Sequence, residues 1–355
     1  MFVWAMRDKG SEWRTMRRFL EAGRLPFTPL VEAVCEPYLT GTGGSLKSPV
    51  EVLEALGNKV APLTDSGRAW IDLGHLTRLF SASDVSKLHR VVRKTSGLAT
   101  HLVTPVVRTS SPGEVVEAVF AWAREERSGI CIRVDGGTHL SQKAGQVTTI
   151  VKESRLREGD IDLVFDAQDL PRAVSHEALS DAFPIGQGAR TWTVLAGTFP
   201  PSITAMSPDV YQHIRDRDEW LAWREEITQS GSGRTPIYGD YATQPALYTP
   251  SPPFPGSPSV RYTTGERYVV LRGRGGSGSR GPDYTQYVGH ALYLTQQQYF
   301  CDVVTTGGDA YVQQIASRTY GTGNLTTWRV ASLQRHLSVV AAQVAQYVAV
   351  LSRAR

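Results

Sequence analysis

The stretch that decides the fold is Ile161-Asp-Leu-Val-Phe-Asp166-Ala-Gln-Asp-Leu170. Its apolar run stops at Asp166, which is typical of a buried parallel strand that delivers one polar side chain to a sheet edge. Seven other apolar runs also stop at a charged residue or a glycine, namely 2–7, 29–36, 69–72, 101–108, 129–133, 192–197 and 236–240. The segments between these runs are long enough for a helix each. The sequence therefore predicts an α/β fold, a TIM-like (β/α)8 barrel.

The predicted organisation has three parts. We expect the barrel over residues 1–246, a Pro-rich connection over 247–259, and a C-terminal extension over 260–355 that packs on the barrel mouth. Barrel helices are predicted at 11–22, 48–57, 84–94, 111–126, 172–182 and 208–228, whereas the pattern of 144–150 supports no assignment. The extension is predicted to hold a β-hairpin over 260–271 and helices at 284–300 and 332–351, with 308–317 as a further candidate.

The composition is that of a globular protein with a sizeable core. The chain has 355 residues, of which 41% are hydrophobic, and a formal net charge of +4. No apolar run approaches the ~20 residues of a membrane span, so we expect neither membrane insertion nor secretion. The three cysteines cannot pair fully, which favours a reducing cytoplasm. The basic excess is mild, and nucleic-acid binding therefore ranks last among the candidate functions.

Familiar cofactor and metal motifs fail in their context. Gly273-Arg-Gly275-Gly-Ser-Gly278 has the spacing of a dinucleotide fingerprint, but Pro282 stands where the helix should begin, and the matching acidic residue is missing. A mobile linker or lid is the better interpretation of this segment. The eight histidines and three cysteines show no zinc-site spacing, so no structural metal is predicted. The cofactor stays unidentified, with a divalent cation as an open option.

Charged residues gather at the predicted strand ends, which meet at one mouth of a (β/α)8 barrel. They are Arg7, Lys9, Glu36, Asp72, Arg108, Arg133, Asp135, Asp166 and Asp240, with Tyr238 and Tyr241 close to the last of them. Arginines and acids together suit an anionic ligand, with carboxylates free to act as acid or base or to hold a cation. The alternative is a buried ion network without chemistry. The two tyrosines either cap the barrel core or stack on a ligand.

Short motifs follow one another over most of the chain. They are the opening strand followed by Lys9 and Glu12, the strands ending in Arg133 and Asp166, Gly197-Thr-Phe199-Pro200, Glu219-Trp220, Tyr238-Gly-Asp240-Tyr241-Ala, Arg261-Tyr262-Thr263, Arg272-Gly273, Gly308-Asp309-Ala-Tyr311, and Trp328-Arg329 with His336. In this order they resemble the beta-protein family of phage and bacterial proteins. The resemblance implies phage biology or antiphage defence as the setting, and it implies no particular reaction or cofactor. A histidine pair of the family pattern is here Arg335-His336, so no role for such a pair is carried over.

The polar motif residues define the predicted site. The candidate catalytic residues are Asp166 and Asp240, as acid–base or metal-binding groups, and Glu12, which together with Lys9 would orient them. The candidate ligand-binding residues are Lys9, Arg133, Arg261, Arg272, Asp309, Tyr238 and Tyr241. We expect the hairpin to fold over the mouth and to place its arginines above the acids. The predicted ligand is a phosphate-bearing or other anionic small molecule. The alternative function is a non-catalytic sensor or inhibitor that binds a phage or host protein through the Pro-rich and Gly/Ser segments.

Overall fold

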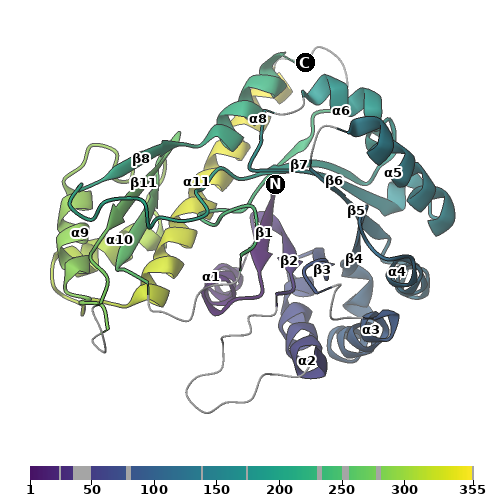
Figure 1. Cartoon of the computed structure of the whole chain (residues 1–355), viewed down its shortest axis with the longest axis horizontal. Helices are drawn as coiled ribbons and strands as arrows, with labels where there is room; N and C mark the ends of the chain where they lie inside the picture. Colours follow the sequence, from purple (N-terminus) through teal and green to yellow (C-terminus); the bar gives the residue numbers. More distant parts are fainter. Residues whose placement is uncertain are drawn as a thin grey trace.

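The computed structural model describes residues 1–23, 25–34, 49–76, 81–136, 139–172, 175–229, 234–249, 256–276 and 281–353. Its centre is a closed barrel of parallel strands in the order β1-β2-β3-β4-β5-β6-β7-β9 (Figure 1). The strands are β1 Phe2–Arg7, β2 Phe27–Glu32, β3 Ala69–Asp72, β4 Val103–Arg108, β5 Ile130–Asp135, β6 Ile161–Gln168, β7 Thr191–Ala196 and β9 Ile237–Asp240. The predicted (β/α)8 barrel is confirmed.

Helices alternate with the strands around the outside of the barrel. They are α1 Gly10–Glu21, α2 Pro49–Val60, α3 Ala82–Ser96, α4 Gly113–Glu126, α5 Leu140–Ser154, α6 His176–Ala182, α7 Ile185–Gly188 and α8 Asp218–Gln229, with short 3-10 helices η1 Ala61–Asp65, η2 Gly97–Leu102 and η3 Glu158–Asp160. Helix α3 begins with a capping box, in which Ser81 and Asp84 satisfy each other's backbone N–H groups. The segment 144–150, which the sequence left without assignment, lies within α5.

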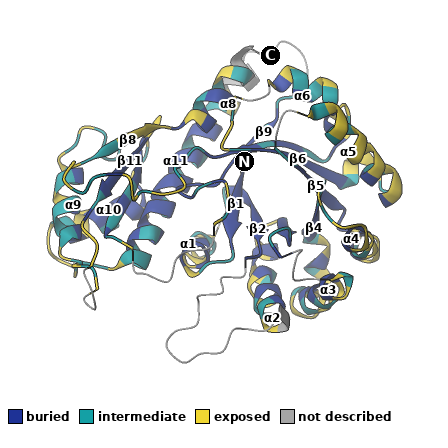
Figure 2. Cartoon of the chain, in the orientation of Figure 1, coloured by how far each residue is buried: buried dark blue, intermediate teal, exposed yellow. Residues whose placement is uncertain are grey.

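The barrel strands are buried (Figure 2), and an apolar layer covers each of their two faces. One fills the barrel interior and includes Val3, Leu30 and Trp70. The other lies between the strands and the helices and includes residues of the opposite parity, such as Trp4 and Val31. Successive side chains of a strand point to opposite faces, so burial on both faces produces continuous apolar runs. These runs are what made the strands recognisable in the sequence.

The helix predicted over 208–228 is wrong in its first half. Residues His213–Asp216 form strand β8, and helix α8 begins only at Asp218. Strand β8 pairs antiparallel with β11, and the backbone N–H of Arg217 donates to the carbonyl of Glu266 at 2.9 Å. The backbone groups of this segment are therefore satisfied by a partner more than 40 residues away in sequence. Such long-range pairing overrides the local helical pattern.

The C-terminal extension is built on the sheet that β8 joins. Its strands follow the order β10-β11-β8, with β10 Ser259–Thr263 and β11 Arg267–Arg272, so the predicted hairpin is confirmed. Helices α9 Gln286–Thr295 and α10 Gly307–Ala316 complete the extension. A separate apolar cluster holds these elements together and includes Tyr262, Leu271, Tyr287 and Trp328.

The last helix, α11 Leu325–Arg353, returns the chain to the barrel. It packs against α1 and β1, and Leu333, Leu337 and Val340 join the apolar layer around the strands (Figure 1). In position α11 is the eighth outer helix of the barrel, and the extension is an insertion between β9 and this helix. No helix in the described ranges is both long and apolar enough to cross a membrane.

Charged and polar side chains that bond one another close the N-terminal end of the barrel. Arg190 donates to Asp162 through Nε at 3.0 Å and Nη2 at 2.6 Å, and Arg68 donates to Oγ1 of Thr104 at 2.9 Å. Asp162 and Thr104 are fully buried. In barrels of this class, residues at this end serve stability and the opposite end carries the site.

Candidate functional site

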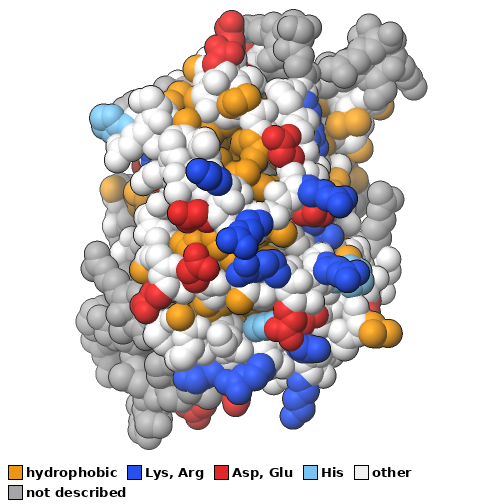
Figure 3. All heavy atoms as spheres, turned by 90° about the vertical axis from the view of Figure 1, so that its right-hand side faces the viewer, with side chains coloured by type: hydrophobic (Ala, Val, Ile, Leu, Met, Phe, Trp, Pro, Cys, Tyr) orange, Lys and Arg blue, Asp and Glu red, His pale blue; other side chains and the backbone are white. Residues whose placement is uncertain are grey.

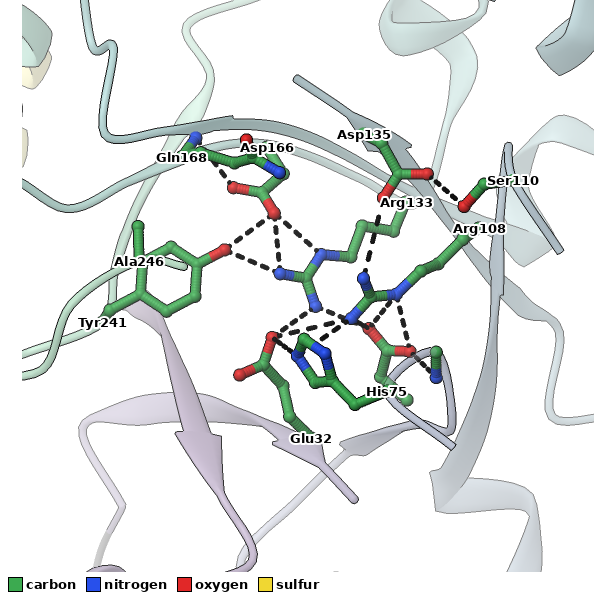
Figure 4. Close-up of polar contacts among 12 residues, drawn as sticks. Glu32, His75, Arg108, Ser110, Arg133, Asp135, Asp166, Gln168, Tyr241 and Ala246 are labelled. Carbon is green, nitrogen blue, oxygen red and sulfur yellow. Dashed lines mark hydrogen bonds and ion pairs between the residues drawn. The ribbon is translucent and has the colours of Figure 1, made fainter. Parts of the chain in front are cut away.

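The C-terminal end of the barrel gathers inward-pointing charged side chains from the strand ends, and Figure 4 shows Glu32, Arg108, Arg133 and Asp166 among them. In each strand the charged residue lies two positions after an apolar residue of the barrel interior, so both side chains point to the same face of the strand. The charged residues are Arg7 from β1, Glu32 from β2, Asp72 from β3, Arg108 from β4, Arg133 from β5 and Asp166 from β6. The prediction that strand ends bring acids and arginines together at one mouth agrees with this arrangement.

Arg133 lies at the centre of this mouth, and all five of its N–H groups have acceptors. Nη1 donates to Oε1 of Glu32 at 2.8 Å and to Oδ2 of Asp72 at 2.5 Å. Nε and Nη2 donate to Oδ2 of Asp166 at 3.1 and 2.7 Å, and Nη2 also donates to the Tyr241 hydroxyl at 2.6 Å. That hydroxyl in turn donates to Asp166 at 2.7 Å. We call these five residues the central network.

The central network holds the carboxylates of Glu32 and Asp72 ionised. Burial alone would raise the pKa of Glu32, but Arg133, His75 and Arg7 outweigh it and hold this pKa far below its usual range. For Asp72 burial is likewise outweighed, by the arginines at 108 and 133, and the pKa falls to about 2. Burial raises the pKa of the Tyr241 phenol well above its ordinary value, so it stays a neutral hydrogen-bond donor.

The segment after β9 covers the central network. Tyr241 and Ala246 pack in the apolar cluster of the barrel interior. Arg7 fixes the segment from below, because its Nη2 donates to the carbonyls of Pro245 at 2.6 Å and Ala246 at 3.1 Å. As a result, no residue of the central network is more than 2% exposed. The centre of the mouth is therefore a closed ion network in this structure.

The rim of the mouth, unlike its centre, is partly exposed to solvent. Arg108 donates to both carboxylate oxygens of Asp72 at 3.0 Å through Nε and reaches towards Asp135, with Nη1 and Oδ1 3.7 Å apart. Asp135 accepts from the Ser110 hydroxyl at 2.6 Å. His75 lies 3.4 Å from Glu32 and borders the network on the other side. The side chains of Arg108, Asp135 and His75 are 13%, 23% and 20% exposed.

Two adjoining hollows open at this rim between α4 and α5. The larger has a volume of about 650 Å³ and the smaller about 270 Å³. They share Thr109, Gln142 and Gln146 in their walls. The larger is further lined by Arg108, Ser111, Gly113, Val116, Glu117, Gly145, Thr149, Ile150 and Glu153, and the smaller by Ser110, Asp135, Gly136, His139 and Lys143. We call the two together the rim groove, whose size suits a small-molecule ligand.

Three predicted site residues meet as expected, since Arg133, Asp166 and Tyr241 are bonded to one another. Lys9 also lies at the mouth, with Nζ 5.5 Å from the ring centre of Tyr248. Glu12 is buried, and its carboxylate accepts hydrogen bonds from the Ser11 hydroxyl at 2.5 Å and from the side-chain amide of Gln244 at 3.3 Å.

Asp240 and Tyr238 point away from the mouth. Both residues lie on the face of β9 that contacts the outer apolar layer. The Tyr238 hydroxyl donates to Oδ2 of Asp240 at 2.8 Å. Nε2 of His336 on α11 lies 2.8 Å from the same oxygen, and all three side chains are buried. Burial opposes ionisation of Asp240, but His336 more than compensates and lowers its pKa. This cluster joins the barrel to its eighth helix rather than facing the mouth.

The three predicted residues of the extension are likewise structural in their contacts. Nη1 of Arg261 donates to the carbonyl of Thr243 at 2.5 Å, and Arg272 donates to the carbonyls of Thr204 and Met206. Neither arginine has an ion pair with a mouth carboxylate within the described ranges, contrary to the expected lid of cations. Asp309 forms a capping box at the start of α10.

Sequence reasoning missed Glu32 and His75. It placed the acid of the second strand at Glu36, which lies outside the described residues, whereas β2 ends at Glu32. The apolar residues 33–35 prolonged the run and hid the strand end. The signal that could have found Glu32 is its two-residue offset from Leu30, which faces the barrel interior.

The structure offers few places for a metal ion. At the mouth the guanidinium of Arg133 already occupies the point on which three carboxylates converge. One other group in the described part of the chain could supply three ligands, His89 with Glu125 and Glu126 on α3 and α4. Arg93 already pairs with both of these glutamates and offsets part of their negative charge.

Fold and site together define a (β/α)8-barrel protein whose mouth carries a closed ion network and an open rim groove. The chain belongs to the Beta protein family, because the family model matches residues 6–342. The comparison with curated proteins finds no match. Among solved structures, N-acetylneuraminate lyase from Mycoplasma synoviae is similar, with 14% sequence identity, a TM-score of 0.32, and coverage of 61% of this chain and 70% of that one.

Proposed function

We propose that this protein binds a small anionic ligand, such as a phosphate-bearing metabolite, in the rim groove. The observation that supports the proposal is the position of the groove. It opens at the carboxyl ends of β4 and β5, where barrels of this class carry their ligand sites. Arg108 lies at the inner end of the groove and is anchored in the charges of the mouth.

The inner end of the groove is suited to negative charge. Lys143 and His139 line it from α5, and Lys143 is held in place by donating to the backbone carbonyl of Asp135. Helices α4 and α5 both begin here, and neither N-cap side chain accepts a hydrogen bond from its helix. Helix N-termini carry unpaired N–H groups and the positive end of the helix dipole. Together these groups can hold a phosphate or carboxylate.

The central network supports the groove without contacting the ligand. Arg133 has no N–H group left for a ligand, and Asp72 holds the Arg108 guanidinium in one orientation. The function proposed is therefore binding at the rim. Catalysis by Asp166 would require the segment after β9 to move away, because Tyr241 covers that carboxylate.

The biological setting stays a prediction. Membership of the Beta protein family accords with the phage or antiphage-defence setting that the sequence resemblance implies. The cytoplasm is the proposed location, supported by Cys131 and Cys301 being free thiols. The alternative partner, a phage or host protein, was expected to bind through the Pro-rich and Gly/Ser segments, and residues 250–255 and 277–280 of these lie outside the described ranges.

The test is a thermal-shift screen with inorganic phosphate, nucleotides and sugar phosphates at constant ionic strength. A ligand that binds only the native state raises Tm with concentration. The double variant His139→Gln, Lys143→Gln should lose this rise. Lys94→Gln, which removes one exposed positive charge from α3, should keep it. The proposal fails if no compound raises Tm, or if the rise is the same in the double variant.

A further inference from the structure

We infer that the ligand of the rim groove is a zwitterion about as long as a short peptide, with its anionic group at the inner end and its cationic group at the outer end. The inference rests on the proposed function and adds the chemistry of the ligand's second end. The geometry points to a peptide with free termini as the simplest such ligand.

The two ends of the groove carry opposite charge. Arg108, Lys143 and His139 stand at the inner end, where the strands stop, together with one carboxylate, Asp135, whose Oδ1 lies 3.7 Å from Nη1 of Arg108. Glu117, one turn into α4, and Glu153, in the last turn of α5, line the larger hollow. Both glutamates are exposed, and neither has an ion pair with a cation in the described part of the chain. Figure 3 shows the face of the molecule that carries α4 and α5, where acidic and basic side chains are interspersed with apolar ones.

The wall between the two ends is uncharged. Val116 and Ile150 are nearly buried and supply the apolar part of the lining, while Thr149 supplies a hydroxyl. Gly113 and Gly145 leave open space where any other residue would have a side chain. The middle of the groove therefore admits an extended chain with amide groups and small side chains, and it offers no partner for a charge there.

The length of the groove excludes a single amino acid. Its α5 wall runs from Gln142 to Glu153, which is roughly 16 Å at 1.5 Å per residue. An extended peptide covers roughly 3.3–3.6 Å per residue, so about four or five residues reach from one end to the other. An amino acid spans one end only. A dianion of this length would bring its second charge against Glu117 and Glu153.

Each end contributes modestly, because its side chains are in contact with solvent. Exposed ion pairs contribute about 0.2–1 kcal/mol, so removal of one terminal charge should weaken binding by up to about fivefold. A zwitterion should lose affinity when either terminal charge is removed, and each loss should depend on the protein residues at that end of the groove. A simple anion should lose affinity only when its negative charge is removed.

The experiment compares three probes by isothermal titration calorimetry at low salt: tetra-alanine, its N-acetyl form and its C-terminal amide. Tetra-alanine should bind tightest, and each capped form should bind about three- to fivefold more weakly. In Glu117→Gln, Glu153→Gln the N-acetyl and free forms should bind equally, while the amide stays weaker. In Lys143→Gln the amide should lose its disadvantage instead. Glu114→Gln, an exposed glutamate of α4 that does not line the groove, is the control and should behave like the parent protein.

Three results overturn the inference. If the free and N-acetyl forms bind equally while the amide is weaker, the anionic site exists but the ligand's second end is not cationic. If no peptide binds while phosphate raises Tm, the zwitterion is wrong and the proposed function stands. If neither peptides nor any phosphate compound binds, the proposed function fails together with the inference.

Discussion

The central network makes a sharp prediction about Arg133→Met, which keeps an unbranched apolar stem and removes the guanidinium with its charge. The variant leaves three buried carboxylates without their shared partner. Glu32 keeps Arg7 at 3.6 Å and His75 at 3.4 Å, and Asp72 keeps Arg108 at 2.9 Å. Asp166 keeps the neutral Tyr241 hydroxyl at 2.7 Å and the backbone N–H of Gln168 at 3.0 Å. Asp166 is thus the carboxylate that loses most.

The expected cost at pH 7 is about 3–5 kcal/mol in the free energy of unfolding, the range for breaking a buried ion pair from one side. Arg172→Met is the matched control, because Arg172 pairs with Glu225 on the surface and both side chains are about half exposed. The free energy of unfolding of Arg172→Met should fall by less than about 1 kcal/mol. Urea denaturation followed by tryptophan fluorescence measures both differences.

The pH dependence separates lost charge from lost packing. In the parent protein the pKa of Asp72 is about 2, below its ordinary 3.8. Its contribution, about 2 kcal/mol, is present above the unfolded pKa and is lost as pH falls from about 4 towards 2. Without Arg133 the carboxylates should bind protons in the folded state already above pH 4. The variant then gains stability relative to the parent protein as pH falls from 7 to 4.5.

The difference between the two proteins should therefore shrink by at least about 1 kcal/mol over this range of pH. A difference that is the same at pH 7 and pH 4.5 would mean that only packing had been lost. A variant within about 1 kcal/mol of the parent protein at pH 7 would refute the central role of Arg133.

Two further substitutions test how the extension is joined to the barrel. Gly308→Ala should destabilise the protein by about 1–3 kcal/mol, because its Cβ would lie 2.3 Å from the carbonyl oxygen of Ala331 on α11. Gly289→Ala in α9 has open space and should be neutral or stabilising by up to about 1 kcal/mol, so equal effects in urea melts would contradict the packing argument. His336→Phe should cost about 3 kcal/mol, because it leaves the buried carboxylate of Asp240 without the imidazole that bonds it. A Tm unchanged from the parent protein would show that this contact contributes nothing.

Much of the fold could be predicted from the sequence because parallel barrel strands are buried on both faces. Ile161–Phe165 is apolar except for Asp162 and stops at an acid, and its seven counterparts are largely apolar runs that stop at a charged residue or a glycine. The same double burial hides the direction in which each side chain points, since no alternation remains to be read. Asp166 and Asp240 both end an apolar run, yet the first faces the mouth and the second faces α11.

The sequence by itself thus determined the eight strands, their order around a closed barrel, and the gathering of charge at one end. Only the tertiary structure decided which charges neutralise one another, because the partners are remote in the chain. Arg133 and Glu32 are 101 residues apart, and β8 finds its partner strand in the extension. The rim groove is tertiary as well, since its walls come from two helices that become neighbours only when the barrel closes. Local periodicity reports burial, whereas the identity of a contact depends on how the whole chain packs.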